Sequence, residues 1–146
     1  MEHYKEFNFM DFSDDRGHLT AIEGSYDIPF EIKRIYYITG AKEGIIRGLH
    51  AHRNLQQIIL CLNGSVKVKL ITPTEEKIFC LDNPTKGLFI GPYTWREMYD
   101  FSDDAVLVVL ASEHYNEDDY IRDLDKFMDE IKKRFLGDEH IGNTIC

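Results

Sequence analysis

Turn signals recur through most of this sequence and divide it into short runs that are rich in β-branched and aromatic residues. The turns contain the glycine, proline, asparagine and aspartate residues that favour chain reversal, and they fall at residues 14–17, 23–25, 28–29, 39–40, 63–64, 72–74, 82–84 and 91–92. Short strands separated at this spacing are typical of a sandwich or a barrel. The sequence therefore predicts an all-β fold.

Seven runs between these turns are predicted strands, at residues 32–39, 56–62, 65–71, 77–81, 87–90, 95–101 and 105–111. Several alternate polar with apolar residues, as antiparallel strands with one buried face do. Only the C-terminal part has a helical period, with one apolar face made by Tyr120, Leu124, Phe127, Met128, Ile131 and Phe135. Asn116 is the predicted N-cap before an acidic first turn. We expect one domain with a β-barrel over 1–116, a C-terminal α-helix over 117–136 and a loose tail over 137–146.

The length of 146 residues fits one domain with one site. The formal net charge of -9, from 17 basic and 26 acidic residues, keeps such a domain soluble and argues against unspecific binding to nucleic acid. It does not exclude an anionic small ligand, because a few converged arginines make a local positive pocket. The charge therefore predicts no nucleic-acid partner and leaves an anionic small-molecule partner open.

Cysteine usage and the N-terminal sequence both indicate a cytoplasmic location. Cys61, Cys80 and Cys146 lack metal-ligand or redox spacing, so we predict two buried thiols and a tail residue in a reducing compartment, with no disulfide. The first nine residues contain no apolar signal core, and no apolar stretch is long enough for a membrane span.

The strongest local motif is Gly-x5-His-x-His-x4-Gln-x6-Gly, which runs from Gly44 through His50, His52 and Gln57 to Gly64. Two histidines at positions i and i+2 of a strand project onto one face, and both meet a ligand if that face lines a barrel interior. Either a metal site or an acid-base site can use them. The spacing resembles the first motif of the cupins, which are double-stranded β-helix, or jelly-roll, barrels that hold a ligand between two sheets.

The motif departs from that of metal-binding cupins, which usually have a glutamate at the position of Gln57 and a further histidine in a second motif. That second motif is present only in part, as Gly87-x4-Pro92, and the nearest residue to its histidine position is Glu97. Two histidines are fewer than the usual ligand count for zinc or non-haem iron. We therefore expect neither a metal nor a cofactor.

Four blocks narrow the resemblance, and they lie at residues 47–53, 87–92, 95–98 and 115–122. They are similar to the sugar 3,4-ketoisomerase family, WxcM-like cupins that act on dTDP-4-keto-6-deoxyglucose, over nearly the whole chain. The resemblance implies an isomerase that moves the carbonyl from carbon 4 to carbon 3 and feeds deoxy-amino-sugar biosynthesis for lipopolysaccharide. It also implies a homodimer, because barrel cupins often pair through an edge strand.

Such an isomerisation needs a base to remove the proton on carbon 3, an enediolate, and an acid to protonate carbon 4. The resemblance assigns the base role to His50, since an imidazole titrates near neutral pH. His52 is expected to relay a proton between the two oxygens, to orient His50, or to act as a structural partner of Gln57. Strand alternation places Tyr36 on one face and Tyr37 on the other, and the resemblance selects Tyr36 as the hydroxyl that stabilises the oxyanion or passes a proton.

Five residues are predicted to bind the substrate. Arg47 offers a fork of donors to a diphosphate or an enediolate oxygen. Arg16 and Arg96 match family positions that differ between members giving galacto and gluco products, and arginine at both leaves the configuration at carbon 4 open. Gln57 and Trp95 complete the set, although core packing is the usual role of a strand aromatic such as Trp95.

Two alternatives belong to other functional classes. A 3,5-epimerase shares the cupin fold and the substrate, but it typically pairs a histidine with a carboxylate, and no carboxylate is adjacent to His50 in the sequence. A non-catalytic cupin would bind a sugar or regulate transcription, but the chain has no basic recognition helix.

Overall fold

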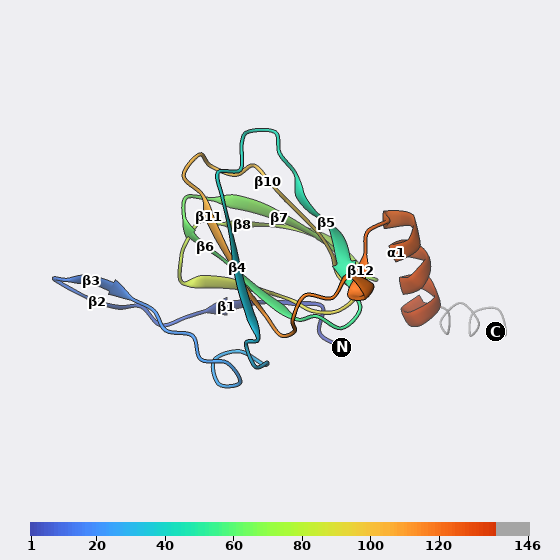
Figure 1. Cartoon of the computed structure of the whole chain (residues 1–146), viewed down its shortest axis with the longest axis horizontal. Coiled ribbons are helices and arrows are strands. Elements are labelled where there is room, and N and C mark those ends of the chain that lie inside the picture. The colour runs from blue at the N-terminus through green and yellow to red at the C-terminus, as the bar shows by residue number, and fades with distance from the viewer. Residues whose placement is uncertain (137–146) are drawn as a thin grey trace.

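Two five-stranded antiparallel sheets pack face to face in the computed structural model, which describes residues 1–136 (Figure 1). The first sheet contains β1 (Tyr4–Asn8), β9 (Lys86–Ile90), β6 (Gln57–Asn63), β11 (Val106–Ala111) and β4 (Arg34–Thr39), in that order. The second contains β12 (Tyr120–Ile121), β5 (Arg47–His52), β10 (Trp95–Tyr99), β7 (Val66–Ile71) and β8 (Glu76–Leu81). Two such sheets around one core form a jelly-roll barrel, so the predicted all-β fold is confirmed.

All seven predicted strands are present, with ends shifted by at most two residues. Their alternation places apolar side chains in the space between the sheets. Val66, Val68 and Leu70 of β7 are fully buried there and belong to the same cluster as Leu88 and Leu107 of the opposite sheet. Burying each such side chain contributes about 1.5–3 kcal/mol to stability.

Polar residues interrupt this apolar interior in one region. His52, Gln57 and Arg96 are each only 1% exposed, although each carries groups that need hydrogen-bond partners. His52 and Arg96 lie in the second sheet and Gln57 lies in the first, so both sheets contribute to this polar region.

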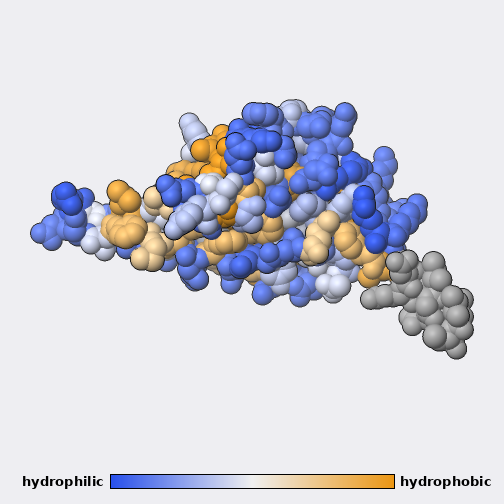
Figure 2. Space-filling model, turned by 90° about the horizontal axis from the view of Figure 1, so that it is seen from below, coloured by the Kyte–Doolittle hydropathy of each residue, from blue (hydrophilic) through white to orange (hydrophobic). Residues whose placement is uncertain are grey.

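A hairpin of β2 (Phe12–Asp14) and β3 (Gly17–Leu19) forms an arm that projects from the body in Figure 1. The predicted turn at residues 14–17 is the tip of this arm. Phe12 and Leu19 on the arm are 59% and 61% exposed, and Figure 2 shows apolar residues on the arm and on the adjoining part of the body.

The C-terminal helix is shorter than predicted. Helix α1 covers Leu124–Ile131, is capped by the side chain of Asp123, and continues into a π-helical turn, η2 (Lys132–Leu136). The predicted start at residue 117 is wrong, because η1 (Glu117–Asp119) is a separate 3-10 turn capped by Asn116 and β12 then pairs with β5. Phe127 and Ile131 attach α1 to the barrel wall.

The thiols differ from the prediction at one position. Cys61 is buried, but Cys80 is exposed, because it alternates with the inward-facing Phe79 and Leu81 on the edge strand β8. Both are free thiols. Cys146 and the predicted tail over 137–146 lie outside the described residues. Within residues 1–136, no helix is both long and apolar enough to span a membrane.

Candidate active site

A β-bulge in β5 determines which side chains face the barrel interior. Gly48 and Leu49 together oppose one residue of β10, and both have positive φ, at 85° and 56°. The extra residue resets the alternation, so that Arg47 faces the same side as His50 and both line the same cavity. Simple alternation would have placed Arg47 on the opposite face from His50.

Gly48 is required at this bulge for a second reason, which is the close approach of β10. A Cβ at position 48 would lie 2.9 Å from the backbone carbonyl oxygen of Arg96 and 3.2 Å from the side chain of Met98. Only glycine combines this contact with a left-handed φ.

His50 is held as a neutral base. Its Nδ1 lies 2.9 Å from the carbonyl oxygen of Gly48, and because a carbonyl only accepts, Nδ1 carries the proton. Nε2 therefore carries the lone pair, and it is buried without a hydrogen-bond partner among residues 1–136. Burial, reinforced by the positive charge of Arg96, lowers the pKa of His50 to about 3. The imidazole is consequently neutral at physiological pH.

His52 lies beside His50, with ring centroids 4.8 Å apart in a T-shaped arrangement. The ring of Tyr120 is 4.2 Å from that of His52 and 4.9 Å from that of His50, so it packs on both. Burial and the charge of Arg96 lower the pKa of His52 as well. Nδ1 of His52 lies 3.2 Å from Oδ2 of Asp119.

Gln57 connects Tyr36 to Arg96 across the two sheets. Its amide nitrogen donates to the Tyr36 hydroxyl at 2.9 Å, and its amide oxygen accepts from Nη1 of Arg96. His52 makes no hydrogen bond to Gln57, contrary to the alternative of a structural partnership, because neither ring nitrogen of His52 has a hydrogen-bond partner within residues 1–136. Burial raises the pKa of Tyr36, so its hydroxyl stays protonated at neutral pH.

Arg96 is a buried cation without a carboxylate partner in the described part of the chain. Its Nη2 donates to the Thr94 carbonyl at 3.0 Å, and its other contact is the neutral Gln57 amide. Burial lowers the pKa of Arg96 to about 10, which still leaves it positive at neutral pH. An uncompensated charge at this depth favours any negative charge that develops beside it.

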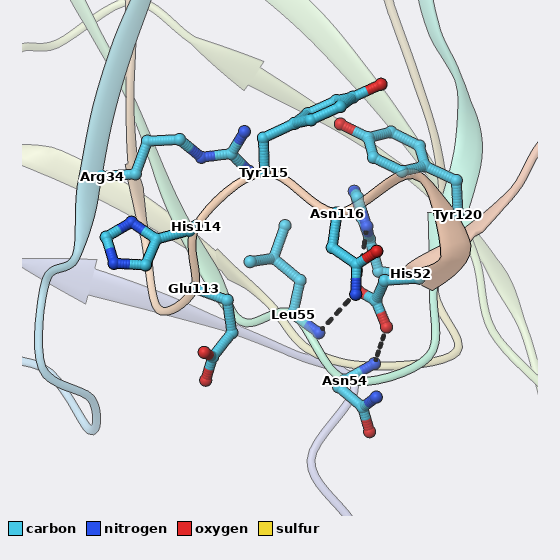
Figure 3. Close-up of a pocket in the computed structure, with 10 residues that line it drawn as sticks. Arg34, His52, Asn54, Leu55, Glu113, His114, Tyr115, Asn116 and Tyr120 are labelled. Atoms are coloured by element: carbon cyan, nitrogen blue, oxygen red, sulfur yellow. Dashed lines mark hydrogen bonds and ion pairs between the residues drawn. The ribbon is translucent and has the colours of Figure 1, made fainter.

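Two adjoining cavities reach the histidine pair and Tyr36 and share Arg34 and Tyr120, whereas Gln57 and Arg96 line neither of them. Figure 3 shows the larger of the two. The larger, of about 560 Å³, is lined by Arg34, His52, Asn54, Leu55, Glu113, His114, Tyr115, Asn116, Asp119 and Tyr120. The smaller, of about 320 Å³, is lined by Arg34, Tyr36, Ile38, Arg47, Gly48, His50, Met98, Tyr120 and Arg122. Cavities of this size accept a small organic ligand, and the three arginines of the smaller one favour an anionic group.

The sequence did not identify four residues of this site, Arg34, Asp119, Tyr120 and Arg122. The guanidinium of Arg34 lies over the rings of Tyr36 and Tyr115, at 5.4 Å and 5.7 Å from their centroids. That of Arg122 lies 4.1 Å from the Tyr120 ring centroid and is paired with Glu117. Arg34 lies two residues before Tyr36 in the same predicted strand, so alternation along that strand could have identified it. Asp119, Tyr120 and Arg122 fall in the block at residues 115–122, which is one of those that carry the family resemblance.

Two predicted residues are not brought to the site in this chain. Trp95 is 3% exposed and packs under α1 against Phe127, because alternation along β10 turns Arg96 inward and Trp95 outward. The prediction of Trp95 as a substrate contact is therefore not supported. Arg16 lies at the tip of the arm, paired with Asp14, with a side chain that is 90% exposed.

Glu97, the nearest sequence candidate for the missing cupin histidine, also faces away from the histidine pair. It accepts the indole N–H of Trp95 at 3.0 Å, on the outer side of β10. No group of three His, Cys, Asp or Glu side chains that could hold a metal ion occurs within residues 1–136.

A family described as FdtA, WxcM-like, C-terminal, matches residues 2–132. The chain belongs to this family. It is 49% identical over 129 residues to the TDP-4-oxo-6-deoxy-alpha-D-glucose-3,4-oxoisomerase of Aneurinibacillus thermoaerophilus. The aligned residues cover 88% of this chain and 93% of that protein. Members of the WxcM-like family that resemble it this closely are sugar 3,4-ketoisomerases, and the chain is an enzyme of this kind.

Solved structures of WxcM-like relatives share its fold. A histidine variant of the 3,4-ketoisomerase QdtA from Thermoanaerobacterium thermosaccharolyticum, in complex with TDP-4-keto-6-deoxyglucose, is 54% identical and has a TM-score of 0.90, over 93% of this chain and 99% of that chain. The WlaRB TDP-quinovose 3,4-ketoisomerase from Campylobacter jejuni is 41% identical with a TM-score of 0.83, over 88% of this chain and 98% of that chain.

Proposed function

We propose that the protein converts TDP-4-keto-6-deoxyglucose to a TDP-3-keto-6-deoxyhexose by proton transfer through an enediolate. The relatives indicate the substrate, since the Aneurinibacillus thermoaerophilus oxoisomerase is named for it and a QdtA variant was crystallised with it. The observation that carries the mechanism is the bonding of His50, whose Nδ1–H is tied to Gly48 and whose Nε2 is left as a buried lone pair. The reaction is internal to the sugar, so it consumes no oxidant and we propose no cofactor.

His50 is the proposed base for the proton on carbon 3. Nε2 takes this proton as the electrons of the C3–H bond move toward the carbonyl, and the proton is then returned to carbon 4. The lowered pKa of His50 keeps Nε2 available at neutral pH, and the tautomer is fixed before the substrate arrives. The base therefore needs no neighbouring carboxylate to select its reactive nitrogen.

Arg96 and Tyr36 are proposed to stabilise the enediolate oxygens. The enediolate carries a negative charge that the substrate lacks, so a cation that is buried and not neutralised stabilises the transition state more than the ground state. Gln57 was predicted to bind the substrate, but it is buried and lines neither cavity, so we assign it to holding Arg96 and Tyr36 in place.

The diphosphate of the substrate is proposed to lie beside Arg34, Arg47 and Arg122, which line the smaller cavity. A local cluster of three guanidinium groups attracts a diphosphate despite the net negative charge of the chain. Arg47 reaches this cavity only because of the bulge at Leu49.

The test is incubation of purified, chelator-treated protein with TDP-4-keto-6-deoxyglucose in deuterated buffer at neutral pH, with the product and its carbon-bound label identified by NMR. We expect a 3-keto sugar, whose configuration at carbon 4 distinguishes the galacto from the gluco outcome. Exchange at carbons 3 and 5 without movement of the carbonyl would indicate an epimerase instead. Binding without any turnover would indicate a sugar-binding cupin.

We further propose that the protein is a cytoplasmic homodimer. Ile35 and Tyr37 on the outer face of β4 are 62% and 70% exposed, and an apolar hollow of about 840 Å³ lies between this sheet and the arm. A second copy would cover these residues, and only in the cavity of a second copy could Arg16 contact a substrate. Sedimentation equilibrium should give twice the chain mass, and a monomer at micromolar concentration would contradict this assembly.

A further inference from the structure

Asp119 is a carboxylate fixed against the histidine pair, and the ketoisomerase mechanism above gives it no role. Its side chain is 11% exposed. Oδ1 accepts the backbone N–H of Asn54 at 2.8 Å and Oδ2 accepts that of Leu55 at 3.1 Å. The backbone carbonyl of Asp119 accepts the N–H of Arg53 at 3.0 Å. The loop that follows β5 thus fixes the carboxylate on several sides.

This carboxylate faces His52. Oδ2 lies 3.2 Å from Nδ1 of His52, and Tyr120, the next residue after Asp119, pairs in register with His52. The contact has hydrogen-bond length, but Nδ1 is not aligned closely enough to count as hydrogen-bonded. Catalytic hydrogen bonds are often misaligned before the substrate binds and tighten in its complex.

The two histidines therefore differ in what their Nδ1 atoms face. The partner of His50 is a neutral carbonyl, whereas the neighbour of His52 is a carboxylate. Both Nε2 atoms are buried without a partner among the described residues. A proton on Nε2 of His52 creates an imidazolium that Asp119 stabilises directly, while no carboxylate contacts Nδ1 of His50.

We propose that Asp119 is a positioning residue that directs Nδ1–H of His52 toward itself and so presents Nε2 to the hydroxyl on carbon 3. His52 then carries the oxygen-bound proton while His50 moves the carbon-bound one. The O–H bond at carbon 3 breaks as Nε2–H forms, and Nε2–H breaks as the O–H bond at carbon 4 forms. His52 begins and ends neutral, and no electron leaves the sugar. The role in turnover depends on the proposed ketoisomerase function.

The variant that tests this role is Asp119→Asn, with Asp118→Asn as the matched control. Asp118 is an exposed neighbour whose carboxylate makes no hydrogen bond or ion pair within residues 1–136, so the control removes the same charge from the same turn. Asp119→Asn should lower kcat by about 100-fold and leave KM within about twofold, since proton transfer by one positioned group contributes on the order of 10²–10⁴. In deuterated buffer, exchange at carbon 3 of the substrate should persist, because His50 is intact.

The ¹⁵N NMR spectrum of the imidazoles provides a readout that does not depend on activity. In the wild-type protein without substrate, His52 should be protonated on Nδ1, and Asp119→Asn should shift this tautomer whereas Asp118→Asn should not. Wild-type His52 protonated on Nε2 would overturn the proposal, and so would an Asp119→Asn variant with the kcat of the control. If Asp119→Asn does not fold, the wild-type spectrum decides alone. Failure of the wild-type protein to turn over the sugar would contradict the proposed function and leave the tautomer result standing.

Discussion

Replacement of Gly48 by alanine should lower both the stability and the activity of the protein. Comparison with Gly40→Ala separates the cost of the left-handed φ from the cost of the steric clash. Both glycines have positive φ, 85° at Gly48 and 68° at Gly40. A Cβ at position 40 meets nothing within 4 Å, whereas one at position 48 lies 2.9 Å from the carbonyl oxygen of Arg96. That oxygen is a backbone atom of the central strand β10, so it cannot rotate away.

The magnitude follows from these two contributions. A left-handed conformation costs an alanine about 1–2 kcal/mol, which applies to both variants. Overpacking against the backbone adds about 1–3 kcal/mol at position 48 alone. Gly40→Ala should therefore lower the free energy of unfolding by about 1–2 kcal/mol and Gly48→Ala by about 2–5 kcal/mol.

Urea unfolding at pH 7 measures the free energy of unfolding of each variant, and kcat/KM with the keto sugar measures its catalytic activity. Separation of β5 from β10 would move His50 away from its place beside Arg96, so only Gly48→Ala should lose activity as well. Equal destabilisation by the two substitutions, with full activity in both, would refute the argument that the bulge positions His50.

Three further perturbations test the electrostatics of the site. Since the pKa of His50 is lowered to about 3, its base form should persist as the pH falls through 6.5, so the wild-type kcat/KM should show no acid limb near 6.5; a fall in wild-type kcat/KM with an apparent pKa near 6.5 would contradict this. Gln57→Glu should neutralise Arg96, raise the pKa of His50 and lower kcat by about 10²-fold, and an unchanged kcat and pH profile would show that the charge of Arg96 is not used. Tyr36→Phe should lower kcat by about 10²-fold with little change in KM, which steady-state kinetics can check; a fall confined to substrate affinity would make the hydroxyl a binding group only.

The amide at position 57 has a physical explanation in this arrangement. A carboxylate there would form an ion pair with Arg96 and remove the positive charge from beside the histidines, whereas the neutral amide binds the same guanidinium and leaves its charge in place. The same charge contributes to the lowered pKa of both His50 and His52. Burial and this one arginine together keep both imidazoles neutral.

The strands and the paired histidines could be predicted from local pattern, because alternation and turn residues depend on nearby positions. The helix start could not, since Tyr120 and Ile121 pair with β5 before Asp123 provides a second N-cap. The acidic segment after Asn116 did indicate a cap, but of a 3-10 turn. Tertiary pairing overrode the local helical signal.

In the site, too, local pattern predicted some positions and tertiary structure determined the others. Alternation correctly separated Tyr36, which lines the smaller cavity, from Tyr37, which is exposed. It would not have placed Arg47 beside His50, because the bulge at Leu49 is not visible in residue types alone. Asp119 lies far from His52 in sequence, and only the turn after Asn116 brings the two into contact. The family resemblance supplied what alternation could not, but it also included Arg16, which points away from the cavity of its own chain.

The most direct test of the account is wild-type turnover of TDP-4-keto-6-deoxyglucose in deuterated buffer beside His50→Asn, with carbon-bound label followed by NMR. The wild-type protein should give a 3-keto product that carries deuterium at carbon 4, and His50→Asn should lose both exchange at carbon 3 and product formation. A variant that still exchanges carbon 3 and forms the 3-keto sugar at the wild-type rate would show that Nε2 of His50 is not the base.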